Sequence, residues 1–120
     1  MKKKTAGQSF VAHAVECMRA FGPVEARRMF GGWGLYREDV FFALVVRDTL
    51  YLKTGDSNRA EFESRDLEPF TFVKGGETVV TSYRAAPEEA LEDPHVMAEW
   101  ARGAYAAALG KPKRRTRPRQ

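Results

Sequence analysis

Few side chains in this sequence have the types and spacing that catalysis or metal binding requires. The two histidines, His13 and His95, have no carboxylate or thiol at a spacing typical of metal ligands. Cys17 lies beside an apolar helical stripe, so we expect a buried, inert thiol and not a nucleophile. No Cys-x-x-Cys, His-x-His or Gly-x-Ser-x-Gly motif occurs in the chain. We therefore expect no metal, no cofactor and no catalytic residues.

An enzyme would need a polar pocket, and four residues on predicted strands are candidates to line it. Isolated lysines and tyrosines on strands are usually surface residues. The acidic clusters at residues 61–68 and 88–93 are typical of solvated helix surfaces rather than of paired catalytic carboxylates. We therefore expect that the protein is not an enzyme. The four candidate lining residues are Tyr51, Lys53, Tyr83 and Arg84.

The run from Met29 to Tyr36 combines three glycines with three aromatic residues and follows two arginines. A phosphate-binding loop is excluded, because these glycines lead into more strand and no lysine follows until Lys53. A bend or bulge in a strand is the better interpretation. Arginine and aromatic residues are enriched at interface hot spots, although packing around the bent strand is an open alternative. The candidate partner-binding residues are Arg27, Arg28, Phe30, Trp33 and Tyr36.

The elements that must position these residues follow from hydrophobic periodicity and turn residues. Apolar residues at helical spacing predict a first helix over residues 6–21, and the apolar run at 40–46 predicts a central strand. Because Arg47-Asp48 is too short for a crossover, the strands on either side must be antiparallel. Gly75-Gly76 predicts a hairpin, and Asp93-Pro94 predicts the start of the last helix. The further elements are an extended segment at 24–36, a strand at 49–53, a helix capped by Asp56 or Ser57 that ends near 65, strands at 70–74 and 78–83, and a short helical turn after Pro87.

This order of elements, α-β-β-β-α-β-β-α, predicts an α+β fold in which helices pack on an antiparallel sheet in two layers. At 120 residues the chain is the size of one domain, which we assign to residues 1–110. Residues 111–120 form a basic tail. No apolar run approaches the roughly 18 residues of a membrane helix. With one cysteine and no signal peptide behind Lys2 to Lys4, we expect a cytoplasmic location.

The net charge of +4 is distributed unevenly along the chain. Residues 5–110 carry 11 basic and 16 acidic side chains, a net charge of −5. The tail could neutralise nucleic-acid phosphates and give weak, salt-sensitive, sequence-independent affinity. A solvated end is the open alternative. The candidate nucleic-acid-binding residues are Lys111, Lys113, Arg114, Arg115, Arg117 and Arg119.

The segment Arg27-Arg28-Met29-Phe30-Gly31-Gly32-Trp33-Gly34-Leu35-Tyr36 resembles the signature of the TfoX N-terminal domain family. The likeness continues through Leu50-Tyr51-Leu52-Lys53, Leu67-Glu68-Pro69-Phe70 and Glu99-Trp100-Ala101, and covers roughly residues 8–109. The resemblance implies the fold order given above and a bacterial, non-enzymatic regulatory role. Full-length family members are positive regulators of competence with a second, helical domain. This chain departs from that pattern after Gly110, where the basic tail follows.

Two functions of different class therefore stand as hypotheses. The first is a regulatory domain that acts by contact with another, unidentified protein. The alternative is nucleic-acid binding through the tail. An open sheet edge or a helix face would also allow a homodimer.

Overall fold

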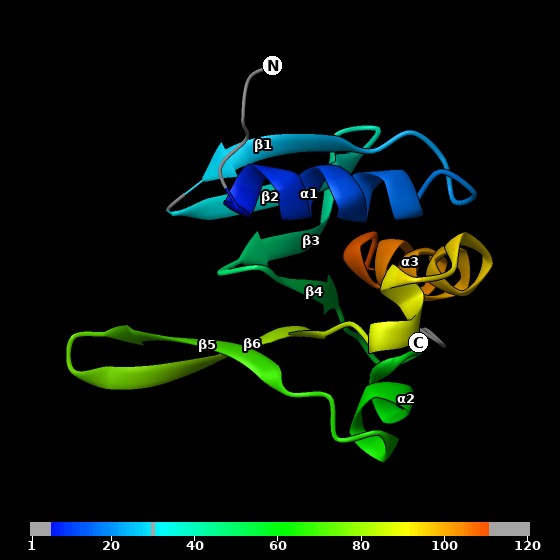
Figure 1. Ribbon diagram of the computed structural model, residues 1–120. Helices are drawn as coiled ribbons and strands as arrows, with labels where there is room; N and C mark the ends of the chain where they lie inside the picture. Colours follow the sequence, from blue (N-terminus) through cyan, green and yellow to red (C-terminus); the bar gives the residue numbers. More distant parts are fainter. Residues whose placement is uncertain (1–5, 30, 111–120) are drawn as a thin grey trace.

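The computed structural model describes residues 6–29 and 31–110, which form one antiparallel sheet with helices packed on it (Figure 1). The sheet has six strands in the order β1-β2-β3-β4-β6-β5. In chain order the elements are α1 (Ala6–Cys17), β1 (Glu25–Met29), β2 (Gly32–Arg37), β3 (Val40–Val46), β4 (Thr49–Lys53), α2 (Arg59–Ser64), β5 (Pro69–Lys74), β6 (Glu77–Ala85), the 3-10 helix η1 (Glu88–Leu91) and α3 (Pro94–Ala108).

Tight turns connect most neighbouring strands. Positive φ angles occur at both residues of Glu38-Asp39, of Arg47-Asp48 and of Gly75-Gly76. This is the backbone of a type I′ turn, whose twist matches that of the strands it joins. The strands on each side pair directly, as in Lys74 opposite Glu77. The two turns predicted from the sequence, Arg47-Asp48 and Gly75-Gly76, are confirmed.

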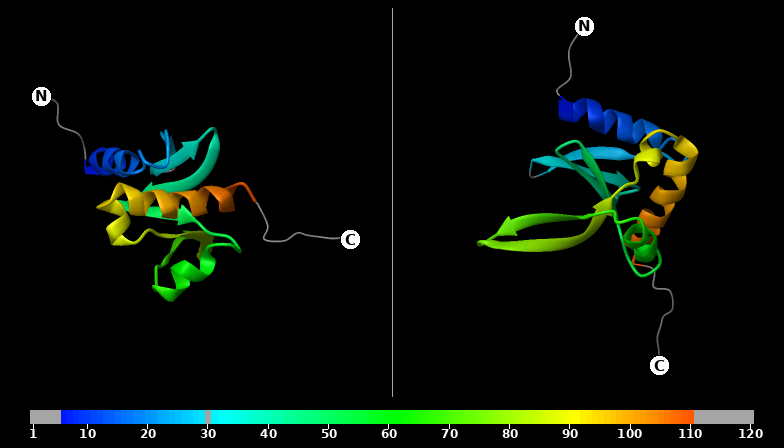
Figure 2. Two further views of the ribbon diagram at one scale, coloured as in Figure 1. Left: turned by 90° about the vertical axis from the view of Figure 1, so that its right-hand side faces the viewer. Right: turned by 60° about the horizontal axis from the view of Figure 1, so that its bottom comes forward.

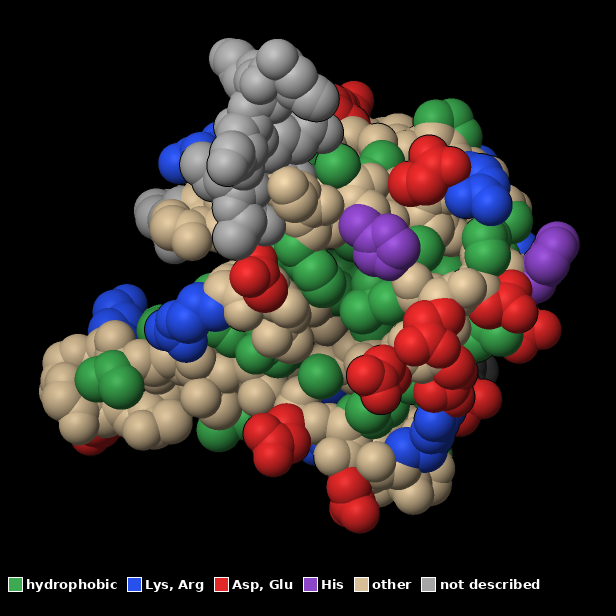
Figure 3. Space-filling model, viewed as in Figure 1, with side chains coloured by type: hydrophobic (Ala, Val, Ile, Leu, Met, Phe, Trp, Pro, Cys, Tyr) green, Lys and Arg blue, Asp and Glu red, His purple; other side chains and the backbone are tan. Residues whose placement is uncertain are grey.

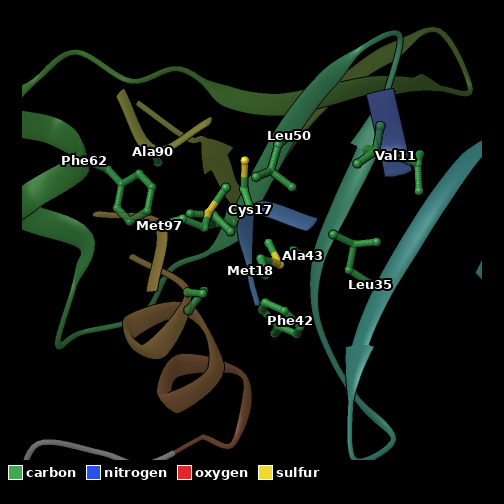
Figure 4. Close-up of a cluster of buried hydrophobic side chains, with 14 residues drawn as sticks. Val11, Cys17, Met18, Leu35, Phe42, Ala43, Leu50, Phe62, Ala90 and Met97 are labelled. Carbon is green, nitrogen blue, oxygen red and sulfur yellow. The ribbon is translucent and has the colours of Figure 1, made fainter. Parts of the chain in front are cut away.

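The helices α1 and α3 pack on one face of the sheet, and the described residues place no helix over the opposite face (Figure 2). The core lies between this sheet face and the helices. Met18 directly after α1, Leu35 of β2, Phe42 of β3 and Met97 of α3 have no exposed surface. Figure 4 shows these side chains converging from distant parts of the chain. The two layers expected from the sequence are therefore present.

The end of the sheet near α2 is closed by contacts between the shorter elements. Phe62 of α2 is fully buried, and its ring meets the Trp100 ring of α3 edge-on at 5.0 Å. The Arg65 guanidinium lies 2.6 Å from the carboxylate of Glu89 in η1. Acidic side chains gather over α2 and η1 on the face seen in Figure 3. This cluster is exposed, as expected for solvated helix surface.

The α+β fold class and the predicted order of helices and strands are confirmed. The bend predicted within residues 24–36 is sharp enough to make a hairpin, so that this segment forms the two paired strands β1 and β2. The first helix ends at Cys17, and residues 18–21 continue as turns in which Phe21 N–H donates to the Met18 carbonyl. The second helix begins one or two residues later than predicted, because Asn58 is its N-cap.

Asp93 caps the last helix as predicted: its carboxylate accepts a hydrogen bond of 2.9 Å from the His95 amide, and Pro94 occupies the first turn. In the part of the chain that the structure describes, no helix is both long and apolar enough to cross a membrane.

Candidate functional site: the aromatic face of the sheet

A β-bulge in β3 decides which aromatic residues lie on each face of the sheet. Leu35 pairs with Ala43, but the next residue, Tyr36, pairs with Phe41, so Phe42 is an extra residue in β3. A bulge of this kind turns two successive side chains toward the same side. Phe42 and Ala43 are accordingly both buried in the core. Phe41 is left on the opposite face, which no described helix covers.

On that opposite face, aromatic side chains from five strands form two groups of rings in contact. In the first group, the Phe41 ring lies 5.3 Å from Tyr36 and 5.4 Å from Tyr83. In the second, Phe70 lies 5.1 Å from Tyr51 and 6.2 Å from Phe72. All these rings are partly exposed, and Phe72 retains 42% of its surface. We call this surface the aromatic face; its apolar and aromatic residues are Met29, Tyr36, Phe41, Leu44, Val46, Tyr51, Phe70, Phe72 and Tyr83.

Two of the glycines in β2 make close packing on the aromatic face feasible. A Cβ atom on Gly34 would lie 2.7 Å from the Met29 sulfur and about 3 Å from the rings of Tyr36 and Phe41. A Cβ atom on Gly32 would lie 2.4 Å from the backbone oxygen of Val45. Glycine is therefore required at Gly32, where the close atom belongs to the backbone, whereas a side chain at Gly34 would displace the flexible Met29 side chain and crowd the two rings. The side chains that pack over Gly34 are those of Met29, Tyr36 and Phe41.

A shallow apolar pocket of about 110 Å³ opens on the same face. It is bordered by residues of β1, β2, β3 and β5, so the β5–β6 hairpin curves toward the first strands of the sheet. The pocket is too small for most organic cofactors, which occupy several hundred cubic ångströms. Its size suits one or two apolar side chains. The bordering residues are Met29, Gly32, Trp33, Leu44, Val46 and Phe70.

Charged groups on the aromatic face are held by neighbouring side chains. The Arg27 guanidinium lies 4.1 Å from the centre of the Tyr36 ring and donates to Glu25 and Asp39 at 3.0 and 2.8 Å. These two hydrogen bonds raise the pKa of Arg27. The Lys53 ammonium donates to the Ser82 hydroxyl at 2.6 Å and lies 5.2 Å from the Tyr83 ring.

Burial raises the pKa of Tyr83 to about 12, with a smaller contribution from Tyr36. Its phenol therefore stays protonated at neutral pH and cannot act as a tyrosinate base there.

The candidate partner-binding residues divide between the two faces of the β1–β2 hairpin. Arg27 and Tyr36 belong to the aromatic face. Arg28 stands opposite Trp33, on the other side of the ribbon, with its guanidinium 5.0 Å from that ring. Trp33 packs partly against the core and also borders the pocket. Phe30 lies outside the described residues.

The six candidate nucleic-acid-binding residues of the tail lie in 111–120, also outside the described residues.

The four residues considered for an enzyme pocket do lie on neighbouring strands. Lys53 pairs with Tyr83, and Leu52 pairs with Arg84. Tyr51, Lys53 and Tyr83 share the aromatic face. Arg84 points to the other face, where it donates to the Leu67 carbonyl at 2.8 Å and approaches Glu63. These four side chains therefore do not line one pocket.

The thiol of Cys17 is buried, as predicted. It donates to the Leu91 carbonyl at 3.2 Å and lies 3.4 Å from His13 Nε2. Burial raises the pKa of Cys17, which keeps the thiol protonated and unreactive. Among residues 6–29 and 31–110, no group of three or more His, Cys, Asp or Glu side chains could hold a metal ion.

Most of the aromatic face was missed by sequence reasoning, because its members come from separate strands. The available signal was the alternation of outward aromatic residues, as in Phe70 and Phe72. A second signal was the apolar character of residues 40–46 on both faces, although the helices that the structure describes cover one face.

Together, the fold and this face define a small α+β domain with an aromatic-rich sheet surface that no helix of residues 6–29 and 31–110 covers. Comparison with known proteins agrees with this description: the model of the TfoX N-terminal domain family matches residues 16–108. The chain belongs to this family.

A curated relative is similar over a shorter segment. It is the DNA transformation protein TfoX1 of Aliivibrio fischeri, which is 36% identical over 66 residues. The matched segment covers 55% of this chain and 32% of the relative. The chain therefore matches about a third of the relative's length.

Proposed function

We propose that this protein is a non-enzymatic regulatory domain that binds another protein through its aromatic face. The observation that carries the proposal is the set of partly exposed rings on a sheet face that none of the described helices covers. Membership of the TfoX N-terminal domain family and the name of the relative support a regulatory role. The proposal concerns binding by this domain and not the whole activity of the longer relative.

The composition of the aromatic face suits a protein partner. Tyrosine, phenylalanine, methionine and arginine are enriched in the cores of protein interfaces. The rings already contact one another, so binding would immobilise few additional side-chain rotamers. The apolar pocket beside Phe70 could accept an anchoring side chain of the partner.

The polar groups of the face do not favour catalysis. The Tyr83 phenol is held protonated, and the Lys53 ammonium is engaged by Ser82 and by the Tyr83 ring. A protonated phenol does not supply a general base at neutral pH, and Lys53 already has a hydrogen-bond partner. A contact surface is therefore the better interpretation of these residues.

The experiment that tests this proposal is affinity capture from the native bacterium with matched variants. Leu44→Glu places a carboxylate among the rings, at a partly exposed site. Val80→Glu is the control, because Val80 is 65% exposed and lies on β6 outside the aromatic face. We expect Leu44→Glu to lose the partner and Val80→Glu to keep it, with both variants folded by circular dichroism. Retention of the same partner by Leu44→Glu would contradict the proposal.

We also propose, as a second function, weak nucleic-acid binding through residues 111–120. The supporting observation is that these ten residues carry six basic side chains and no acidic one. Retention on DNA at low and at moderate salt should depend on the tail and fall steeply with salt. DNA retention that survives removal of residues 111–120, or no retention at low salt, would contradict it.

A further inference from the structure

The strand β5 forms one edge of the sheet, and no described strand pairs with its outer side. Together with β6 it makes an arm that projects from the domain (Figure 1). The arm carries three of the four large hydrophobic residues that are exposed in the described chain: Phe72 at 42%, Val73 at 70% and Val80 at 65%. An exposed apolar edge strand is a template for pairing with another strand.

Hydrogen bonds to β6 identify the backbone groups that face this free edge. The Glu68 carbonyl accepts from the Ala85 amide at 2.8 Å, and the Phe70 carbonyl accepts from the Thr81 hydroxyl at 2.8 Å. Both carbonyls therefore point toward β6. Because the direction alternates along a strand of an antiparallel sheet, the amide and carbonyl of Thr71 point outward. Thr71 can then exchange two hydrogen bonds with an incoming antiparallel strand.

The sequence around Thr71 is complementary to itself when reversed. It reads Glu68-Pro69-Phe70-Thr71-Phe72-Val73-Lys74. If two copies pair antiparallel with Thr71 opposite Thr71, Phe70 faces Phe72 and Glu68 faces Lys74, twice each. Opposite charges and aromatic pairs directly across two strands are favourable.

The backbone groups at the two ends of the paired segment, at Val73 and Pro69, are also compatible with this register. The outward amide of Val73 would donate to the Pro69 carbonyl of the other copy. Pro69 has no N–H to donate in return to the Val73 carbonyl of the other copy. Because this pair lies at the end of the paired segment, that carbonyl can accept a hydrogen bond from water instead. Sliding one copy by two residues would place Lys74 opposite Phe70 in one direction and Glu68 opposite Phe72 in the other, so either shift breaks the pairing of Glu68 with Lys74.

We propose that β5 is a homodimerisation strand, which pairs with β5 of a second copy in the register that places Thr71 opposite Thr71. The twofold symmetry closes the assembly at two chains and joins the two six-stranded sheets into one. Within the described residues, neither Glu68 nor Lys74 takes part in an ion pair, so both are available. Phe70 and Phe72 of the two copies would extend the aromatic face across the symmetry axis. This inference does not depend on the proposed function.

Reversing the charges of Glu68 and Lys74, with the mass of the assembly measured by sedimentation equilibrium, tests the strand pairing and its register. The unaltered protein should have about twice the chain mass of 13.5 kDa. Lys74→Glu and Glu68→Lys should each weaken the dimer by on the order of tenfold or more, because each places like charges opposite at two sites. The double variant should dimerise again. An equal mixture of the two single variants should form a heterodimer, because both of its charge pairs are then complementary.

A second pair of variants tests the centre of the strand. Thr71→Lys would place two ammonium groups opposite each other, whereas Thr78→Lys adds the same charge on β6, away from the edge. Both positions are exposed, so both variants should fold. We expect only Thr71→Lys to yield monomers. The proposal is overturned if the unaltered protein is monomeric, if its dimer resists the Thr71→Lys and single charge variants, or if mixing the two single charge variants fails to restore dimers.

Discussion

At the scale of single residues, Gly32 shows how closely the strands of the sheet approach. A Cβ atom at this position would lie 2.4 Å from the Val45 carbonyl oxygen, a backbone atom that cannot move alone. We therefore expect Gly32→Ala to lower the free energy of unfolding by roughly 1–3 kcal/mol, the usual range for overpacking. Urea denaturation measures this change.

Gly103 provides the matched control for that substitution. It lies inside α3, and a Cβ atom there would meet Asn58 only at 3.6 Å, an ordinary contact. Gly103→Ala should therefore leave the stability unchanged or raise it by up to about 1 kcal/mol, because alanine favours a helix interior. Equal destabilisation by both substitutions would contradict this account of Gly32.

Tyr83 should make the stability depend on pH in the alkaline range. Its pKa is about 12 in the folded protein, against an ordinary value of 10.0. As the pH rises above about 10 the unfolded chain loses this proton first, so the free energy of unfolding should fall between about pH 10 and 12. Below pH 10 the contribution is fully present. Tyr83→Phe should reduce this decline.

An absorbance titration of tyrosinate checks the same point directly. The chain has four tyrosines, and one of them should ionise late in the folded protein. That late step should be absent from Tyr83→Phe. Ionisation of Tyr83 near pH 10, seen as the absence of any difference between the titrations of the unaltered protein and Tyr83→Phe above that pH, would show that Tyr83 is not shielded by burial.

At the scale of elements, the last helix depends on its N-cap. Asp93 accepts the hydrogen bond of the His95 amide, and α3 contributes Met97, Ala98, Ala101 and Ala104 to the buried core. Asp93→Ala should cost about 1 kcal/mol of stability, whereas Asp93→Ser, which retains a capping oxygen, should cost much less. Thermal or urea unfolding measures both. A cost for Asp93→Ser as large as that for alanine would point to a role of the charge and not of the cap.

The sequence was sufficient to predict elements whose ends carry specific turn or cap residues. Gly75-Gly76 and Asp93-Pro94 are examples, and both act as predicted. The β1–β2 hairpin was interpreted as a bend, because glycines permit a bend and a reversal equally well. The pairing of the two strands, as of Arg28 with Trp33, distinguishes a hairpin from a bend, and this pairing is a contact between strands.

The candidate site was predicted less completely than the fold, for a related reason. Arg27 and Tyr36 were identified because they lie in one conspicuous segment. Phe41, Phe70 and Tyr83 reach the same face from three other strands. The bulge at Phe42 places Phe41 on the side opposite to the one that strict alternation along β3 would give. Such a face results from strand order and register, which local sequence patterns do not specify.

At the scale of the whole molecule, the two faces of the sheet have different roles. Helices α1 and α3 bury one face, and the other presents its aromatic residues without a helical cover among the described residues. The edge strand β5 adds a third surface, suited to a second copy of the chain. In this account the partner binds the aromatic face, and the edge strand remains available for the dimer.

Side-chain footprinting by hydroxyl radicals, with and without the captured partner, tests the central claim most directly. The account predicts that oxidation of Tyr51 and Phe72 falls several-fold in the complex, because the partner covers the aromatic face. Oxidation of Leu109, which is 45% exposed at the end of α3 and away from that face, should not change. Protection of Leu109 with unchanged oxidation of Tyr51 and Phe72 would place the partner elsewhere and contradict the account.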